Sequence, residues 1–249
     1  LGAHVEGPYL NAKRCGAQKL EWIRRADPAE AKVWFDLGVV RLLALAPEYA
    51  ESRALITECV RRGITVSAAH TDATFADLQT AVALGLRQTT HTFNAMSALH
   101  HREPGVVGAA LTLPELRCEL IADNLHVHPA VMAVLHQAKG RDGVILISDA
   151  VPAAGLPDGH YPMDEGREVW VNDGAVRLPD GTLAGSTLMM NQALVNYARA
   201  TGRSFSYLWP ATSLNAARAL GMETRKGSLD LGRDADLVAL TPNGDVVLG

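Results

Sequence analysis

Residues 52–93 read SRALITECVRRGITVSAAHTDATFADLQTAVALGLRQTTHTF, and this stretch decides the fold class. Residues 52–63 have the apolar spacing of a helix, begin with a serine and end at a glycine. The apolar run 64–70 that follows is typical of a strand. A second helix is predicted over 72–85 and a second strand over 86–93. Strands and helices that alternate with short connections predict βα units and a parallel sheet.

The same alternation continues on both sides of this stretch. A short apolar run, 39–48, precedes it, and a strand over 118–123, a helix over 128–140 and a strand over 143–149 follow it. The last of these, GVILISD, is almost continuously apolar, as in a parallel sheet that is covered on both faces. No Gly-x-Gly-x-x-Gly motif follows a strand, so a dinucleotide-binding fold has no support. The sheet is therefore either open and doubly wound or closed as a (β/α)8 barrel.

The second part of the chain has a different pattern of residues. Within residues 160–186, the turn sequences NDG and PDG separate short alternating runs, which predicts β-hairpins. Helices are predicted over 186–202 and 206–221, and the tail reads as strand, turn, strand. We expect a main domain over residues 1–230 and, over 231–249, strands of a small β domain.

Composition limits the classes of partner. The 249 residues are 48% hydrophobic and 20% charged, and the net charge is −4. This balance does not favour a nucleic-acid partner. No apolar stretch approaches the roughly 20 residues of a membrane span, and the first residues do not resemble a signal peptide. We therefore expect no membrane partner. The three cysteines are odd in number and far apart, so we expect a reducing, cytoplasmic location.

Reactive side chains follow the predicted strands. His70, His91 and Asp149 each close a strand, and Glu6 follows the strand-like run GAHV. Barrel enzymes collect catalytic groups from the carboxyl ends of several strands, so this placement favours the barrel. Imidazole and carboxylate groups suit Zn²⁺, Fe²⁺ or Mn²⁺, which predicts a metal centre with an open position for water. Asp149 is then the natural proton acceptor.

Each of these residues also has a plainer interpretation. A single histidine at a strand end is usually a polar residue of the rim. Asp149 could cap a turn, and Glu6 could be a loop carboxylate. The argument for a metal hydrolase is their coincidence at several strand ends.

Further polar residues follow two of the strands. The stretch FNAMSALHHREPGVVGAAL, residues 93–111, brings Asn94 and Arg102 into a loop, and arginine is the side chain that grips a phosphate bidentately. The alternative for Arg102 is an incidental residue of a solvated loop. His126 and His128 lie after another strand, in IADNLHVHP. One of them could polarise a carbonyl oxygen, while the other caps the helix that begins near residue 129.

Seven stretches of sequence, which run from near the first residue to near the last, belong together. They are HVEGPYLN, SAAHTDATF, THTFNAMSALHHREPGVVGAAL, IADNLHVHP, LISDAVPAAGLPDGHY, GTLAGSTLMMNQAL and GSLDLGRDADLVAL. Together they resemble the N-acetylglucosamine-6-phosphate deacetylase family of the amidohydrolase superfamily. The run HTFNAMSALHHREPGVVGA is the most specific, because no generic barrel needs it.

The resemblance implies an α/β fold with a metal-dependent (β/α)8 TIM-type barrel and the remnant of a small β domain. It implies hydrolysis of the N-acetyl group of N-acetylglucosamine 6-phosphate to glucosamine 6-phosphate and acetate. One divalent ion per subunit is implied, Zn²⁺ first and Fe²⁺, Mn²⁺ or Co²⁺ as alternatives. A homodimer that binds an amino sugar phosphate is implied as well. The other candidates are a different amidohydrolase, such as a cyclic-amide hydrolase, and a catalytically incompetent fragment that only binds sugar phosphate.

The resemblance also assigns roles to individual residues. It makes Glu6, His70 and His91 the metal ligands and Asp149 the acid/base catalyst. The substrate-binding residues that it implies are Ala17, Gln18, Asn94, Ala95, Arg102, His126, Leu183, Ala184 and Gly185.

The sequence departs from the family pattern at three places. The family's early segment, with the first barrel strand and its His-x-His, is absent, so we expect a barrel that is incomplete at its N-terminus. Gln18 stands where the family often has histidine, which makes a second metal doubtful. SDAV replaces the commoner TDAM or TDAT, although Asp149 itself is retained.

Overall fold

The computed structural model describes residues 1–164 and 166–248, and the chain divides into two compact units. The first unit consists of Leu1–Glu119 together with Arg218–Met222, and the second of Leu120–Ala217 together with Glu223–Gly249.

The first unit contains a parallel sheet. Its strands are β1 (Ala3–Glu6), β2 (Val40–Leu45), β3 (Thr65–Ala68), β4 (Gln88–Thr89) and β5 (Arg117–Ile121). Each pairs in parallel with the next, for example through Ala44 opposite Ser67. The parallel sheet predicted from the alternating pattern is therefore confirmed.

The closed eight-stranded barrel is not what the described residues form. The strand order of this sheet is β1-β2-β3-β4-β5-β6, where β6 is Val144–Ile147. After β6 the chain forms antiparallel hairpins instead of further βα units, so the described residues give a six-stranded sheet.

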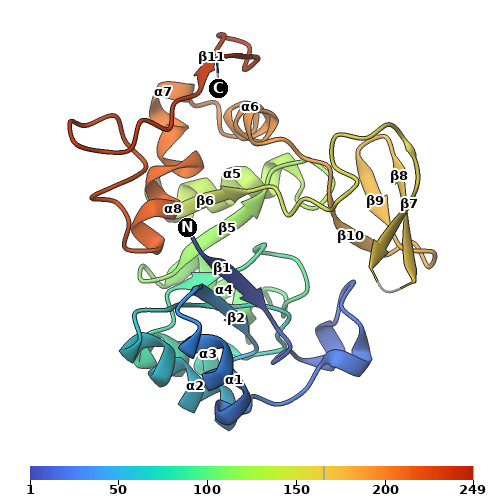
Figure 1. Ribbon diagram of the computed structural model, residues 1–249, viewed down its shortest axis with the longest axis vertical. Helices are drawn as coiled ribbons and strands as arrows, with labels where there is room; N and C mark the ends of the chain where they lie inside the picture. Colours follow the sequence, from blue (N-terminus) through green and yellow to red (C-terminus); the bar gives the residue numbers. More distant parts are fainter. Residues whose placement is uncertain (165, 249) are drawn as a thin grey trace. The chain divides into compact units, whose positions relative to one another are not determined.

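Helices connect the strands of the first unit. They are α1 (Pro28–Asp36), α2 (Ala50–Arg61), α3 (Phe75–Leu84) and α4 (Gly105–Thr112), with short 3₁₀ turns η1 (Ala12–Arg14) and η2 (Leu20–Trp22). Figure 1 shows α1, α2 and α3 side by side in the blue and cyan part of the chain.

Local sequence explains the ends of α3, but not the start of α2. Thr74 and Asp77 form a capping box at the N-terminus of α3, and Gly85 ends it with a φ of 113°. Helix α2 begins at Ala50, so the predicted start at Ser52 is wrong. Ser52 is fully buried inside the helix, where it faces the core and does not cap the first turn.

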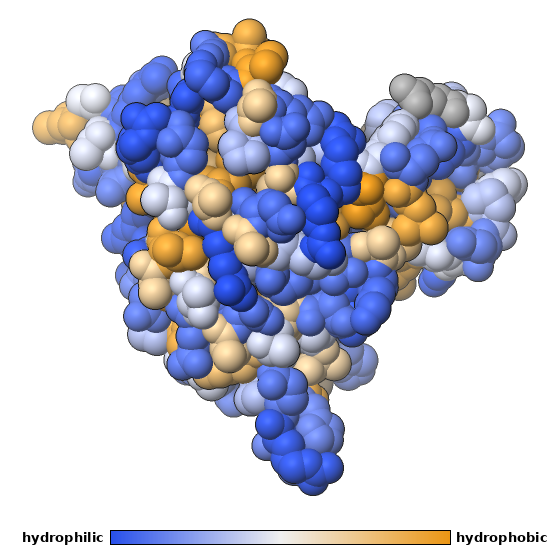
Figure 2. Space-filling view, turned by 90° about the horizontal axis from the view of Figure 1, so that it is seen from below, coloured by the Kyte–Doolittle hydropathy of each residue, from blue (hydrophilic) through white to orange (hydrophobic). Residues whose placement is uncertain are grey.

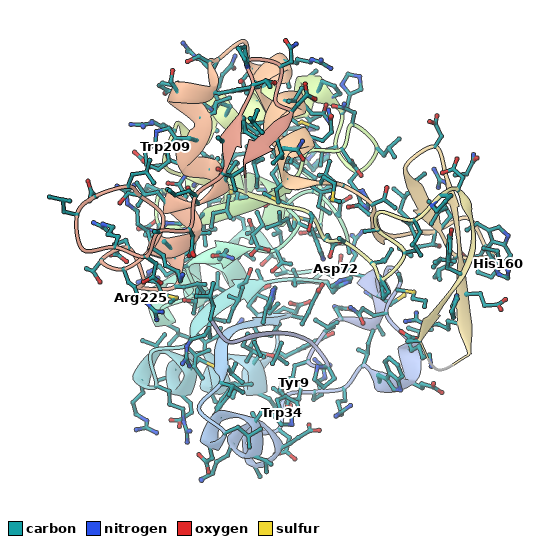
Figure 3. All side chains as sticks on the ribbon, turned by 45° about the horizontal axis from the view of Figure 1, so that its top comes forward. Tyr9, Trp34, Asp72, His160, Trp209 and Arg225 are labelled. Atoms are coloured by element: carbon teal, nitrogen blue, oxygen red, sulfur yellow. The ribbon has the colours of Figure 1, made fainter. Side chains whose placement is uncertain are left out.

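The core of the first unit is aliphatic, with one aromatic stack at its margin. Leu43, Leu45 and Ile56 are fully buried between the sheet and its helices. Tyr9 stacks on Trp34 with ring centroids 5.6 Å apart, and both are labelled in Figure 3. This packing holds the segment after β1 in place, so the position of Glu6 at the end of β1 depends on it.

The second unit contains the predicted hairpins. Its antiparallel sheet has the order β10-β9-β8-β7, built from β7 (Gly159–Asp164), β8 (Arg167–Asn172), β9 (Ala175–Arg177) and β10 (Leu183–Ser186). Asp173 and Gly174, with φ of 49° and 78°, form the turn between β8 and β9, as NDG predicted.

Helices of the second unit differ from the prediction at two boundaries. They are α5 (Pro129–Lys139), α6 (Met190–Thr201), α7 (Phe205–Leu208) and the 3₁₀ turn η3 (Trp209–Thr212), followed by α8 (Leu214–Ala219), which ends in the first unit. The helix predicted over 186–202 begins only at Met190, because Ser186 belongs to β10. The helix predicted over 206–221 is divided at Pro210, whose ring cannot continue an α-helix.

The tail forms a small antiparallel pair, β11 (Ala239–Leu240) with β12 (Val246–Leu248), as predicted. Gly249, the last residue of the predicted small β domain, lies outside the described residues, and the domain boundary at residue 230 stays a prediction.

Within the described residues, no helix combines the length and the apolar character that a membrane span requires. The face shown in Figure 2 is mainly hydrophilic, with several separate hydrophobic patches.

Candidate metal centre and active site

Glu6, His70 and His91 converge in the first unit. One ligand atom of each residue lies within 4.8 Å of the others. Oε1 of Glu6 is 2.9 Å from Nε2 of His70 and 3.0 Å from Nε2 of His91, and the two Nε2 atoms are 3.2 Å apart. Both imidazoles are buried, so three side chains that are far apart in the sequence enclose one small volume.

The sheet explains this convergence. Glu6 is the last residue of β1, His70 is two residues past the end of β3, and His91 is two residues past the end of β4. Parallel strands end at the same edge of a sheet, so their following residues meet there. His70 and His91 adopt positive φ values of 43° and 32°, an uncommon conformation for histidine.

A hydrogen bond to the backbone fixes the tautomer of His70. Nδ1 of His70 lies 2.7 Å from the carbonyl oxygen of Arg14, which can only accept, so Nδ1 carries the proton. In the neutral ring, Nε2 then presents a lone pair toward the carboxylate of Glu6. Two acceptors at this separation repel unless a proton or a cation lies between them.

These donors fit a divalent cation. Bonds of about 2.0–2.2 Å to a tetrahedral ion would place the ligand atoms about 3.4 Å from one another. The observed separations of 2.9–3.2 Å are slightly shorter than that. Two imidazole nitrogens and one carboxylate oxygen are the ligand types that Zn²⁺ and related ions accept.

A network of polar contacts holds the loop that carries His70. The guanidinium of Arg14 donates to Oδ1 of Asp72 from Nε and Nη2, at 2.9 and 2.7 Å. The backbone N–H of Asn11 donates to the carbonyl oxygen of His70 at 2.8 Å. Glu48 accepts from the side chain of Asn11 and from the backbone N–H of Asp72, at 2.8 and 2.9 Å. These contacts restrain both the side chain of Arg14 and the backbone of the loop that carries His70. The Arg14 carbonyl group and the His70 ring therefore keep their relative position.

The carboxyl group of Glu6 is ionised in this environment. Burial alone raises its pKa, but the hydrogen bonds and the electrostatic attraction that His70 and His91 supply when a proton lies on their Nε2 atoms outweigh burial. The pKa of Glu6 is therefore held well below its ordinary value.

The loop after His91 contains three residues that the sequence implicated in substrate binding. Asn94 donates from its side chain to the carbonyl oxygen of His91 at 3.1 Å. The carbonyl of Ala95 accepts from the backbone N–H of Thr71 at 3.1 Å, which ties this loop to the loop that carries His70. Arg102 is exposed, and its Nη1 lies 2.7 Å from Nε2 of His101.

Ala17 and Gln18 lie in the turn between η1 and η2. Gln18 lines a cavity of about 260 Å³ together with Glu6. Gly16, directly before them, has a φ of 55°, and a Cβ there would lie 3.2 Å from Cε1 of His70. This turn therefore packs directly against the cluster of Glu6, His70 and His91.

The remaining candidates, Asp149, His126 and residues 183–185, belong to the second unit. Asp149 lies two residues past the end of β6 with a φ of 50°. Its carbonyl oxygen accepts from the backbone N–H of Ser186 at 2.8 Å, so the end of β10 is bound to the Asp149 loop. Leu183, Ala184 and Gly185 form the first three positions of β10. A Cβ on Gly185 would lie 2.7 Å from the Asp149 carbonyl oxygen, so this close approach requires glycine.

The two histidines after β5 have different partners. Nδ1 of His126 lies 2.6 Å from Oδ2 of Asp123, and both side chains are 7% exposed. His128 is the N-cap of α5, and its Nδ1 accepts from the backbone N–H of Ala130 at 3.2 Å. The expectation that one of these histidines caps the helix is therefore confirmed.

The sequence reasoning missed two partners of the candidate residues. The carbonyl group of Arg14 leaves no signal in a sequence, because every residue carries one. Asp123 does leave a signal, since it precedes His126 by three residues in the turn sequence DNLH.

Comparisons with known proteins identify the family of the chain. The model of the amidohydrolase family matches residues 1–249. An N-acetylglucosamine-6-phosphate deacetylase of Bacillus subtilis is 43% identical over 100% of this chain and 63% of its own length. An N-acetylgalactosamine-6-phosphate deacetylase of Escherichia coli O157:H7 is 39% identical over 96% of this chain and 64% of its own length.

A solved structure is similar as well. It is a mutant N-acetyl-D-glucosamine-6-phosphate deacetylase of Mycobacterium smegmatis in complex with N-acetyl-D-glucosamine-6-phosphate. The TM-score is 0.94 at 34% identity, over 98% of this chain and 65% of that one. The chain thus spans less than two thirds of the length of each of these relatives.

Proposed function

The protein belongs to the amidohydrolase family, and on that premise we propose that it hydrolyses the N-acetyl amide of N-acetylglucosamine 6-phosphate. The products are glucosamine 6-phosphate and acetate. Most of the support comes from one observation, the convergence of one carboxylate oxygen of Glu6 with Nε2 of His70 and Nε2 of His91. The names of the similar proteins supply the substrate class.

In this proposal the three converging side chains hold one divalent cation, Zn²⁺ first and Fe²⁺, Mn²⁺ or Co²⁺ as alternatives. When bound, the cation makes hydroxide available near neutral pH by lowering the pKa of water. Glu6 would contribute the negative charge, and the Arg14 carbonyl keeps the lone pair of His70 Nε2 directed toward Glu6 and His91, where a cation would be held.

Asp149 is the acid/base catalyst of the proposal. Its carboxylate takes a proton from the attacking water and returns it to the amide nitrogen, so the C–N bond breaks and a neutral amine leaves. The positive φ of Asp149 and the bond from Ser186 to its carbonyl hold its backbone in one conformation. A group that both accepts and returns a proton needs such a fixed position.

Substrate binding is assigned to two sets of residues. Arg102, Asn94 and Ala95 meet the sugar phosphate, and Ala17 and Gln18 contribute from the turn beside the cluster. His126 contacts the substrate near its carbonyl or hydroxyl groups, and Leu183 to Gly185 line the acetyl and sugar side.

Three broader properties complete the proposal. The functional protein is a cytoplasmic homodimer, its fold is the barrel of the family, and residues 231–249 contribute strands to a small β domain. The cyclic-amide hydrolase alternative receives no support from the similar proteins, which are named as deacetylases. The alternative of a fragment that only binds sugar phosphate is decided by the experiment below.

The test is acetate release together with metal analysis. The chain is purified, loaded separately with each of the four cations, and assayed with N-acetylglucosamine 6-phosphate and its galactose epimer. We expect a preference for the glucose form, in line with the relatives at 43% and 39% identity. Binding of the sugar phosphate without acetate release by the metal-loaded chain would overturn the hydrolase and favour the binding fragment.

Two variants separate metal binding from proton transfer. His91→Ala should lose both the metal and the activity. Asp149→Asn should keep the metal and lose roughly 10²–10⁴-fold in rate, since asparagine also tolerates a positive φ. Asp173→Asn is the matched control, because Asp173 has a φ of 49° in the exposed β8–β9 turn. Near-normal turnover of Asp149→Asn would refute its role.

A further inference from the structure

We propose that Asp123 is a positioning residue, which holds His126 in the Nδ1–H tautomer and so leaves Nε2 as the nitrogen that meets the substrate. This inference rests on the proposed function for the role of His126, whereas the tautomer itself can be tested without any substrate.

The contact between the two side chains is short and shielded. Nδ1 of His126 lies 2.6 Å from Oδ2 of Asp123, and each side chain is 7% exposed. A carboxylate accepts and does not donate, so the proton of the pair lies on Nδ1. Because little water reaches the pair, water does not compete for the donor and the acceptor of this hydrogen bond.

The backbone fixes the other oxygen of Asp123. Oδ1 accepts from the backbone N–H groups of Leu125 and His126, both at 2.8 Å. Burial raises the pKa of Asp123, but the His126 ring and these backbone donors lower it below its ordinary value, so the group is an ionised acceptor. Oδ1 of Asp123 therefore caps the turn, and Oδ2 accepts from the ring of His126.

This division predicts what an amide does at position 123. Asparagine has only one oxygen, and two backbone N–H groups already require it. Its NH₂ group then faces Nδ1 of His126, which must become an acceptor, so the ring proton moves to Nε2. Asp123→Asn therefore keeps the turn and reverses the tautomer.

A turn cap alone is the competing interpretation, and the chain offers a matched control for it. Oδ1 of Asp27, the N-cap of α1, accepts from the backbone N–H groups of Ala29 and Glu30 in the first turn of that helix, at 2.8 and 3.4 Å, with the same i+2 and i+3 spacing. The residue at i+3 is a glutamate in this turn, not a histidine. Asp27→Asn measures the cost of the amide to such a turn without any histidine tautomer.

The first experiment reads the tautomer directly. The metal-free 249-residue chain is labelled with ¹⁵N in its histidines, and His126 is assigned by the signals that disappear in His126→Gln. Above pH 8, the wild type should show the Nδ1–H pattern for His126, and Asp123→Asn should show the Nε2–H pattern. The Nε2–H pattern in the wild type, or an unchanged tautomer in Asp123→Asn, would overturn the proposal.

The second experiment is a double-mutant cycle on acetate release. Asp123→Asn should lower kcat by roughly 10- to 100-fold, while the Tm shifts no more than it does for Asp27→Asn. In the His126→Gln background, Asp123→Asn should change kcat by less than about twofold, because its partner is absent. Additive losses would mean that Asp123 does not act through His126 and would refute the positioning role.

The two experiments keep this proposal apart from the proposed function. A chain that releases no acetate contradicts the deacetylase activity, but its histidine spectra still report the tautomer. A chain that is active yet keeps the Nδ1–H tautomer in Asp123→Asn contradicts only the role of Asp123.

Discussion

Gly185→Ala tests whether the close contact between β10 and the Asp149 loop positions the candidate catalyst. Gly185 has a φ of 71°, and a Cβ at this position would lie 2.7 Å from the Asp149 carbonyl oxygen and 2.8 Å from Cγ1 of Val151. The backbone conformation costs an alanine about 1–2 kcal/mol. The contacts add about 1–3 kcal/mol, since a backbone oxygen cannot rotate away. The expected loss of stability is therefore roughly 2–5 kcal/mol.

Gly181→Ala separates these two contributions. Gly181 lies in the turn before β10 with a φ of 87°, and a Cβ there would have no heavy atom within 4 Å. Its alanine variant should lose only the conformational part, about 1–2 kcal/mol. Gly185→Ala combined with Val151→Ala should recover part of the difference, because it removes the side-chain contact and leaves the carbonyl contact.

The assay combines urea unfolding with turnover. With a slope of about 3 kcal/mol per M, Gly185→Ala should lower the urea midpoint by roughly 0.7–1.7 M. Turnover in the absence of urea should fall roughly 10- to 100-fold for Gly185→Ala and stay near normal for Gly181→Ala, since displaced catalytic groups lose rate steeply. Equal midpoints and equal turnover for the two variants would show that no such contact positions Asp149.

Three other perturbations have expected outcomes. Burial and, to a lesser extent, the charge of Arg203 lower the pKa of His136 below its ordinary 6.5, so the stability that neutral His136 contributes is present above pH 6.5 and lost as the pH falls below it. Urea midpoints at pH 7.5 and 5.5 should therefore differ less in His136→Gln, and an identical pH dependence would contradict this. Asp72→Ala releases Arg14 and should weaken Zn²⁺ binding about 10- to 100-fold by calorimetry, whereas unchanged affinity would exclude a role in orienting the ligand. Arg102→Ala should raise KM about 10- to 100-fold for the phosphorylated sugar only; an equal effect on unphosphorylated N-acetylglucosamine would end the phosphate assignment.

The kinds of element were predictable, and the boundaries were less so. Periodicity separates strands from helices in residues 52–93, because burial on one face of a helix imposes period 3.6, whereas burial on both faces of a strand gives a continuous apolar run. The starts of α2 and α6 depend on tertiary contacts that periodicity does not encode. Ser52 resembles an N-cap in the sequence yet is buried in the core, and Ser186 is bound to the Asp149 loop.

The candidate metal ligands could be expected from one topological rule, that parallel strands end at a common edge. The rule selects Glu6, His70 and His91 without any local motif, since only their positions at strand ends matter. It does not select the Arg14 carbonyl, because a backbone acceptor is recognised only when the fold brings it to the ring. It also leaves the closure of the sheet undetermined, because parallel strands end at a common edge in open and closed sheets alike.

The backbone at three candidate residues adds an argument that no sequence pattern contains. His70, His91 and Asp149 each lie two residues past a strand, and their φ values are 43°, 32° and 50°. Such conformations are unfavourable for residues other than glycine and persist only where the surrounding structure enforces them. A glycine at any of these positions would relieve the backbone, so the presence of a chemically reactive side chain at all three points to a chemical role that outweighs the conformational cost. Replacing each by glycine should abolish acetate release and also remove the contacts of the side chain, while it relieves the backbone. Each glycine variant should therefore be more stable than the corresponding alanine variant in urea unfolding, and alanine variants of equal or greater stability would show that the backbone is not strained.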